Sequence, residues 1–476
     1  MRINHNISAL KACNILGKTG SALDKSLERL SSGYRINRAA DDAAGLAISE
    51  KMKTQIAGLE QASRNAADGI SVIQTAEGAL DEVEAMLQRM RELSVQAANG
   101  VNTDEDRAAI QEEIDQLNEE ITRVSETTEF NTKKLLNGTV DRRSYSDNEK
   151  IQLISLSDSV AITEYKLTVD TAPQPAKVQM DEIPTADRTG KLGDGFEGKI
   201  SINEKEIEVT KEDSIEDIYE RLREAGSNVG VNVTPMKENA AGEQEVSTIA
   251  DADYILFESK DLGEDASIEI FCDNQKLAEA LGFSSGRSGG GADAKVTLDY
   301  DSGFSRTATV SVDGDYVTVT DVDDFKMKFK VDGTGEEATV TVLKAGPMDL
   351  QIGANEGQTM EVRIPKVDTD TLGTAVVNVN TQESAQKAIT IFENAINEVS
   401  SIRAKLGAYQ NRLEHSINSL NISAENLTEA LSRVEDVDMA KEMVTFTQQQ
   451  VLSQSGNAML AQANQRPQQI LSLLQS

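Results

Sequence analysis

Apolar residues recur at the spacing of a helix seam near the start of the chain. Between residues 52 and 90 they alternate three and four positions apart, as in a helix that packs against other helices. One series steps by seven residues and a second fills the slots between, and together they comprise Met52, Leu59, Ala66, Ile73, Leu80, Leu87, Ala62, Gly69, Ala76, Val83 and Met90. No proline interrupts residues 42–99, so the pattern predicts one long helix.

The same pattern returns near the far end of the chain. Its members are Phe392, Ala395, Val399, Ile402, Leu406, Tyr409, Leu413, Ile417, Leu420, Ala424, Leu427, Leu431 and Val434. A shorter helix is predicted over residues 104–127, because Ile110, Ile114, Leu117, Ile121 and Val124 share one face. These helices predict a coiled-coil-like rod built from both chain ends, which is a structural design and not the shape of a pocket enzyme.

The two terminal segments carry weaker apolar stripes. Residues 1–34 are predicted to form a helix that ends at Gly33, and residues 437–476 a glutamine-rich helix. Such helices are marginal alone in water and need a partner. The candidate partner-binding residues are Ile3, Ile7, Leu10, Val444, Val451, Ala458, Leu471 and Leu474.

The middle of the chain has a different character. Six of the seven prolines lie between residues 173 and 365, and the apolar spacing there drops toward two. Strands are predicted over residues 199–202, 207–209, 229–233, 254–258 and 267–271, with a short helix near 215–222. Further strands over 295–301, 307–312, 316–320, 325–331 and 338–343 are expected to form an antiparallel sheet, and residues 151–156 and 165–169 a hairpin beside the rod. The predicted fold class is therefore a mainly α rod with a β-rich (α+β) insert.

Composition excludes several classes of function. The 476 residues carry a net charge of −33, which argues against binding to a nucleic-acid backbone. No run of 18 apolar residues exists, so no membrane insertion is expected, and the start of the chain lacks the apolar block of a signal peptide. Cys13 and Cys272 lie in unlike segments, which makes a disulfide framework or a zinc site an unlikely design.

No residue pattern points to catalysis, a cofactor or a metal. Asp41 and Asp42 stand just before the long helix, where a helix cap is the favoured interpretation. His5 and His415 have no metalloprotease spacing. Gly58, Gly69 and Gly78 each cost about 1 kcal/mol relative to alanine inside a helix, which suggests that another helix approaches closely there. We expect a protein that is not an enzyme.

Three stretches of the sequence resemble one family. Residues 30–48 (LSSGYRINRAADDAAGLAI) resemble the N-terminal signature of bacterial flagellins, and residues 87–99 (LQRMRELSVQAAN) the next stretch of their helical core. Residues 460–474 (LAQANQRPQQILSLL) resemble the flagellin C-terminus, although Arg466 stands where an apolar residue is more usual. Residues 196–283 resemble a repeat module of flagellins and hook-associated proteins.

The resemblance implies a domain order. Residues 1–41 and 435–476 would form the inner tube of a filament, and residues 42–172 and 376–434 the rod of its outer tube. Residues 173–286 would form an α+β outer domain that resembles the repeat module, and residues 287–375 a β-rich outer domain.

The resemblance also implies partners. The chain would be a motility subunit, secreted by the flagellar type III apparatus, that polymerises with itself outside the cell. It would meet an export chaperone, a filament cap protein and a hook–filament junction protein. Related flagellins are bound by the host Toll-like receptor 5, at positions that match Arg89, Leu93 and Glu113 here.

Alternatives remain at this stage. A hook–filament junction protein would share the N-terminal signature, and an intracellular coiled-coil scaffold would share the seams. Arg89, Arg91 and Glu92 could form a solvated helix face or could face a neighbour or receptor. Since Leu87 and Met90 hold seam positions, Arg89 and Leu93 are expected beside the packed face and at least partly exposed.

Overall fold

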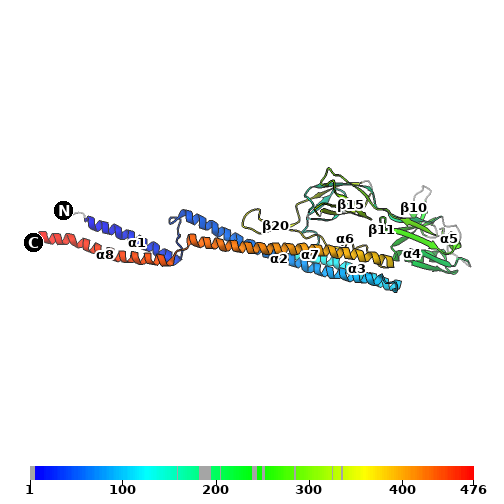
Figure 1. Cartoon of the computed structure of the whole chain (residues 1–476), viewed down its shortest axis with the longest axis horizontal. Helices are drawn as coiled ribbons and strands as arrows, with labels where there is room; N and C mark the ends of the chain where they lie inside the picture. The colour runs from blue at the N-terminus through cyan, green and yellow to red at the C-terminus, as the bar shows by residue number, and fades with distance from the viewer. Residues whose placement is uncertain are drawn as a thin grey trace. The chain divides into compact units, whose positions relative to one another are not determined.

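The computed structural model describes residues 6–157, 159–181, 195–203, 205–238, 244–248, 252–282, 286–323, 325–333 and 336–475. Long helices form both ends of the chain, and β-sheets lie between them in the sequence (Figure 1). The chain divides into two compact units. The first comprises Met1–Ile70, Leu350–Met360 and Asn411–Ser476, and the second Ser71–Asp349 and Glu361–Gln410. The predicted fold class is confirmed.

Local sequence signals explain where the long helices begin and end. These helices are α1 (Ile7–Ser32), α2 (Ala43–Ala97), α3 (Asp104–Thr127), α7 (Gln382–Glu435) and α8 (Met439–Gln475). Gly33 ends α1 in the left-handed conformation, with a φ of 78°. Asp42 accepts a hydrogen bond from the backbone N of Gly45 at 2.9 Å, as expected of a helix cap. Thr103 and Asp106 form a reciprocal capping box at the start of α3.

In the first unit, α1 lies along α8. The side chain of Asn6 donates to the carbonyl of Ala463 at 2.9 Å, and Arg29 and Glu442 pair at 3.9 Å. A methyl group on Gly456 would lie 3.2 Å from Leu16 Cδ1, so the two helices approach closely there. These contacts give each marginal terminal helix a partner, although the apolar stripes predicted on the two helices remain exposed.

The breaks that follow α1 and precede α8 are tied together. Tyr34 and Asp436 form an antiparallel bridge, and Lys53 Nζ lies 2.6 Å from Glu435 Oε1. The hydrogen bond to Glu435 raises the pKa of Lys53, so the lysine stays charged across the physiological pH range. The break between α1 and α2 therefore lies beside the break between α7 and α8.

In the second unit, α2, α3 and α7 lie alongside one another (Figure 1), and each contributes buried apolar residues. Arg403 on α7 pairs with Asp81 at 2.9 Å and with Glu84 on α2. The fully buried seam residues are Ile73, Ala76, Leu80, Val83, Leu87, Met90, Ile114, Ile121, Phe392, Val399 and Leu406. In the first unit, where α3 is absent, the seam residues Met52, Leu59, Ile417 and Leu420 are only half-buried.

Four antiparallel sheets of four strands lie between α3 and α7 in the sequence and form two pairs. The first pair has the strand orders β14-β5-β18-β3 and β15-β16-β17-β4. Its strands are β3 (Ser144–Ser146), β4 (Ile151–Leu156), β5 (Glu164–Thr171), β14 (Lys295–Leu298), β15 (Thr309–Asp313), β16 (Tyr316–Asp321), β17 (Phe325–Val331) and β18 (Glu336–Val342). They enclose the Phe329 core, whose buried members include Tyr165, Val169, Val317, Phe329 and Val340.

This pairing corrects two predictions. β4 and β5 do not form a hairpin, because β4 pairs with β17, and β5 pairs with β14 and β18. The strands after residue 295 do not form one sheet, because β14 and β18 join β5 while β15, β16 and β17 join β4. Strand alternation reveals which face is buried but not which strand is the neighbour, and here the neighbours are far apart in the sequence.

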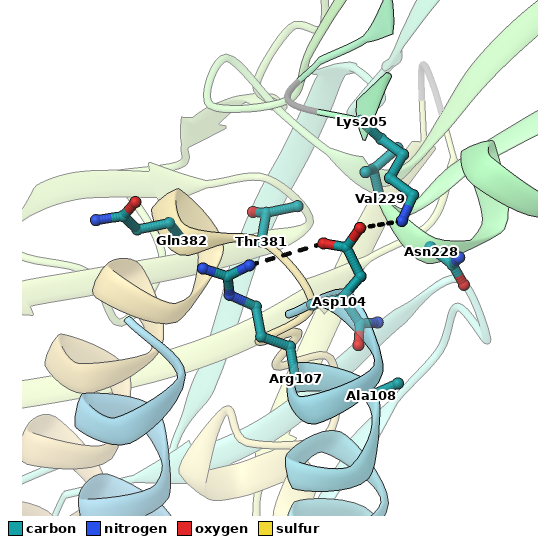
Figure 2. Close-up of a pocket in the computed structure, with 9 residues that line it drawn as sticks. Asp104, Arg107, Ala108, Lys205, Asn228, Val229, Thr381 and Gln382 are labelled. Carbon is teal, nitrogen blue, oxygen red and sulfur yellow. Dashed lines mark hydrogen bonds and ion pairs between the residues drawn. The ribbon is translucent and has the colours of Figure 1, made fainter. Parts of the chain in front are cut away.

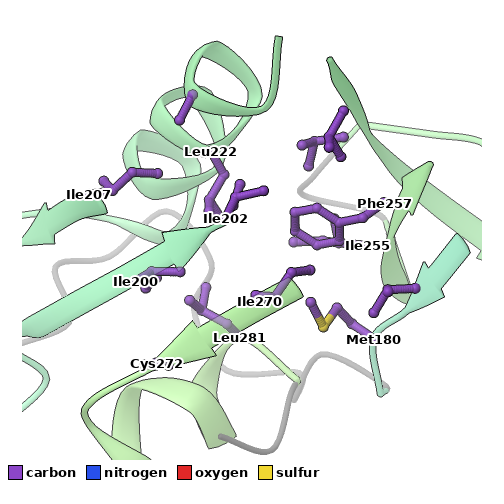
Figure 3. Packing of buried hydrophobic residues seen from close by; sticks show 14 of the residues in the cluster. Met180, Ile200, Ile202, Ile207, Leu222, Ile255, Phe257, Ile270, Cys272 and Leu281 are labelled. Carbon is purple, nitrogen blue, oxygen red and sulfur yellow. The ribbon is translucent and has the colours of Figure 1, made fainter. Parts of the chain in front are cut away.

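The second pair of sheets encloses the Phe257 core (Figure 3). Its strand orders are β10-β9-β11-β6 and β13-β12-β7-β8. The strands are β6 (Pro175–Gln179), β7 (Gly198–Ile202), β8 (Lys205–Val209), β9 (Val231–Glu238), β10 (Gln244–Val246), β11 (Tyr254–Leu262), β12 (Ser267–Cys272) and β13 (Arg287–Gly290), with helices α4 (Ile215–Asn228) and α5 (Gln275–Ala280). Ile202, Leu222, Phe257 and Ile270 meet in this core.

Short elements complete the chain. They are β1 (Glu129–Phe130), β2 (Lys133–Lys134), β19 (Met348–Gln351), β20 (Thr359–Val362) and α6 (Thr369–Leu372). Because the Phe329 core contains strands from both sides of residue 172, that predicted domain limit falls between strands of one sheet system. The limits of the four domains stay a prediction.

The β19–β20 hairpin explains two of the helix glycines. In the first unit, a methyl group on Gly58 would lie 2.9 Å from Ala354 Cβ, and one on Gly69 would lie 2.3 Å from Leu350 Cδ1. The hairpin therefore makes the closest approach at both glycines, and helix α7 also approaches Gly69, where Leu413 Cδ1 would lie 3.4 Å from the added methyl group. Gly78 has no atom within 4 Å of such a methyl group, so packing does not require it.

We predict opposite effects of alanine at these glycines. Gly78→Ala should raise the free energy of unfolding by up to about 1 kcal/mol, because only helix propensity changes. Gly58→Ala should gain less or lose stability, since the methyl group meets Ala354. Thermal melting measured by circular dichroism would test the order, and equal gains in the two variants would contradict the seating of the hairpin.

The two ends of the segment that contains the four large β-sheets lie side by side, near Arg143 and Leu343. Arg143 N donates to the carbonyl of Ala345 at 2.9 Å, and Leu343 N donates to the carbonyl of Arg143 at 2.8 Å. We predict that replacing residues 144–343 with Gly-Gly leaves a folded helical protein. Replacing residues 173–375 should instead cause aggregation, because β3, β4 and β5 lose their partners. Size-exclusion chromatography and helicity of both variants would distinguish them; a folded, monomeric second variant would refute this account.

Candidate functional site

An exposed charged cluster joins α2 to α3. Arg89 Nε and Nη2 donate to Glu113 Oε1 at 3.0 and 2.9 Å, and Arg89 Nη1 lies 3.4 Å from Glu92 Oε2. The hydrogen bond to Glu113, followed by the charge of that carboxylate, raises the pKa of Arg89. The structure thus brings together Arg89 and Glu113, which lie apart in the sequence, on a solvent-facing surface.

The expected exposure of Leu93 is wrong. Its side chain is 2% exposed and lies in the core with Met90 and Ala97. The two-position stripe predicted too narrow a buried face, because in the second unit α2 is covered by both α3 and α7. Leu93 therefore supports the surface that carries Arg89 and is not itself part of that surface.

The α1–α8 pair exposes many apolar side chains. Among the predicted residues, Ile7, Leu10, Val444, Val451 and Ala458 face solvent. Ile3 lies outside the described residues. Leu471 and Leu474 lie within α8, but their side chains are outside the described part.

Sequence reasoning missed further members of this apolar surface. Ile15, Met439, Met443, Leu452 and Met459 are also exposed. A search for residues seven positions apart finds one stripe per helix and omits the other sides. The structure is needed to find them, because it shows that the buried side chains of α1 are the polar residues Thr19 and Ser26. Exposed apolar surface of this extent marks an interaction site.

A polar hollow lies among the ends of α3, α4 and α7 (Figure 2). Its volume is about 170 Å³, and its lining includes Asp104, Arg107, Lys205, Asn228 and Gln382. Asp104 pairs with Lys205 and lies 3.7 Å from Arg107, while Arg107 Nε donates to the carbonyl of Ala97 at 3.0 Å. The lining charges already satisfy one another, and the lining offers no nucleophile beside a base.

Other chemistry is not evident in the described part of the chain. Among these residues, no three histidine, cysteine or acidic side chains gather in a way that could hold a metal ion. Burial raises the pKa of the Cys272 thiol, which makes it a poor nucleophile. None of the described helices is both long and apolar enough to cross a membrane.

Both ends of the chain match known family regions. Residues 3–141 match the bacterial flagellin N-terminal helical region, and residues 389–474 match the bacterial flagellin C-terminal helical region.

The curated relatives extend over the whole chain. The chain is 36% identical to a flagellin of Clostridium tyrobutyricum, over 98% of this chain and all of the relative. It is also 36% identical to a flagellin of Bacillus subtilis, over the full length of both.

Solved structures show more distant similarity. A flagellar hook-associated protein 3 from Legionella pneumophila is 12% identical, with 81% of this chain and 98% of that chain covered, at a TM-score of 0.31. FliC from Burkholderia pseudomallei is 17% identical, with 72% of this chain and 99% of that chain covered, at a TM-score of 0.24. The identity shared with full-length relatives shows the family. The chain belongs to the bacterial flagellins, the structural subunits of the flagellar filament.

Proposed function

We propose that this chain polymerises with copies of itself into an extracellular helical filament for motility, and that the α1–α8 pair forms the contacts between copies. The observation that carries the proposal is the apolar surface of this pair. Leu10 is 67% and Val451 is 60% exposed, although both are large apolar residues. Copies that cover these side chains would remove them from water, and complete burial of such a side chain contributes about 1.5–3 kcal/mol.

The half-buried seam of the first unit supports the same proposal. Met52 and Leu59 on α2, and Ile417 and Leu420 on α7, are only half-buried, and the first unit, to which they belong, contains no part of α3. A neighbouring copy would take the place that α3 holds in the second unit. The subunit contacts would then continue from the terminal helices onto the adjacent part of α2 and α7.

The proposed export and assembly of the subunit rest on its membership of the flagellin family. The chain would be secreted by the flagellar type III apparatus with an export chaperone, and would be added beneath a filament cap protein. The first copies would join a hook–filament junction protein. A role as the junction protein itself is the alternative within the organelle, and the full-length identity with flagellins favours the filament subunit. An intracellular scaffold has no comparable support.

We further propose that Arg89 and Glu113 contact host Toll-like receptor 5. Both side chains are exposed and hydrogen-bonded to each other, so they present a fixed donor and acceptor pair. The buried Leu93 would hold the α2 surface in place. A receptor that binds these groups would compete with copies of the chain if assembly covers the same surface.

The assembly proposal predicts that variants of the exposed apolar surface fold normally but form filaments more slowly. The double variant Leu10→Ser and Val451→Ser should keep its melting temperature, because both side chains already face water, but should slow the seeded growth of filaments. Val101→Ser is the matched control, since Val101 is 80% exposed in the turn before α3. Light scattering and negative-stain microscopy would follow growth. Normal growth of the double variant would contradict the proposed contact surface.

The receptor proposal predicts different effects for the exposed residues Arg89 and Glu113 and for the buried residue Leu93. Arg89→Ala and Glu113→Ala should each weaken binding to the receptor and leave thermal melting nearly unchanged. Leu93→Ala should lower the free energy of unfolding by about 2–5 kcal/mol, because it leaves a cavity. Arg123→Ala removes a similar exposed pair with Glu120 on α3 and serves as the control. Surface plasmon resonance would measure affinity, and equal affinity of Arg89→Ala, Glu113→Ala and the control would overturn the site.

A further inference from the structure

The chain passes twice between the Phe329 core and the Phe257 core. One crossing joins β5 to β6, and the other joins β13 to β14. The crossings pair at Gln174 and Ala292, with Gln174 N donating to Ala292 O at 2.8 Å and Ala292 N donating to Gln174 O at 3.0 Å. Two paired crossings alone form a ribbon, which can bend and twist. Relative motion of the two cores would be the default expectation.

A third contact lies beside the ribbon. The turn between β11 and β12 touches the hairpin turn between β15 and β16 at two glycines. A methyl group on Gly263 would lie 2.5 Å from Gly314 Cα, and one on Gly314 would lie 2.6 Å from Leu262 O. The φ angles of Gly263 and Gly314 are 102° and 61°, which other residues rarely adopt. Both turns therefore need glycine for their own shape and for their contact.

The crossing between β13 and β14 holds these turns. Asp293 Oδ1 accepts from Glu264 N at 2.7 Å and from Gly314 N at 3.3 Å. One carboxylate oxygen thus binds a turn from each core. Ala294 N also donates to Gly314 O at 3.4 Å.

A third glycine, Gly291, lets the crossing between β13 and β14 pack closely against its neighbours. A methyl group on Gly291 would lie 2.2 Å from Gly263 O and 2.6 Å from Gln174 O. Backbone therefore packs directly on backbone from one turn, through both crossings, to the other turn. Because few side-chain torsions lie within this contact, it has little freedom to rearrange.

We propose that Gly263, Gly291, Gly314 and Asp293 form a joint that fixes the two β-cores of the chain as one rigid body. The third contact adds a direct connection between turns of the two cores, so it restricts the bending that the two crossings alone would permit. Asp293 is a positioning residue that binds both turns. This inference concerns the single chain and does not rest on polymerisation.

Distances between spin labels in the full-length chain would test the joint. Labels at Glu216→Cys on α4 and Glu149→Cys before β4 report on the Phe257 and Phe329 cores, in a Cys13→Ser background. We expect one narrow distance distribution for the otherwise unchanged chain. Gly263→Ala and Gly314→Ala should add a second, broader component. Gly286→Ala is the matched control, because Gly286 has a φ of 91° but no atom within 4 Å of an added methyl group.

Variants at Asp293 keep the test decisive if a glycine variant fails to fold. Asp293→Ala removes the acceptor and should broaden the distribution, while Asp293→Asn retains an oxygen acceptor and should restore the narrow one. Circular dichroism would verify that each variant is folded. A narrow distribution in folded Asp293→Ala, or a broad one in the unchanged chain, would overturn the proposal.

Discussion

The burial of one apolar seam governs the rest of this molecule. No single long helix can cover its own stripe, and the helices that cover α2 come from opposite ends of the chain. In the second unit, the seam residues of α2 from Ile73 to Met90 are completely buried. In the first unit, which contains no part of α3, the larger seam residues Met52, Leu59, Ile417 and Leu420 are only half-buried. The same apolar pattern is therefore completely buried in the second unit and incompletely buried in the first. The incompletely buried part is where we propose that a neighbouring copy binds.

The helices were predictable because their signals are local. The seams, the cap at Asp42 and the left-handed Gly33 can each be recognised within a few residues, and the structure places the helix ends there. Sheet pairing was not predictable, since β5 binds β14 and β18 across more than a hundred residues. The alternation of β12 shows that Ile268 and Ile270 are buried, but no local signal names the partner strand.

The candidate site shows the same division. The match to flagellins selected Arg89 and Glu113, and the structure brings them within hydrogen-bond distance. Leu93 was misplaced because a stripe of seam positions cannot reveal how many helices will cover it. The role of Gly58 and Gly69 was half right, since a glycine reveals that something approaches closely but not what approaches.

The hydrogen bonds between Arg143 and the segment at 343–345 also matter for the order of folding. An unstructured loop of roughly 200 residues would cost the helices about 4 kcal/mol more loop-closure entropy than a two-residue turn. Once the Phe329 core has formed, however, its two ends lie side by side. To the helices, the whole inserted segment then has the entropy of a tight turn. A chain whose middle folds first would bring its distant ends together at almost no further entropic cost, whatever the length of the segment between them.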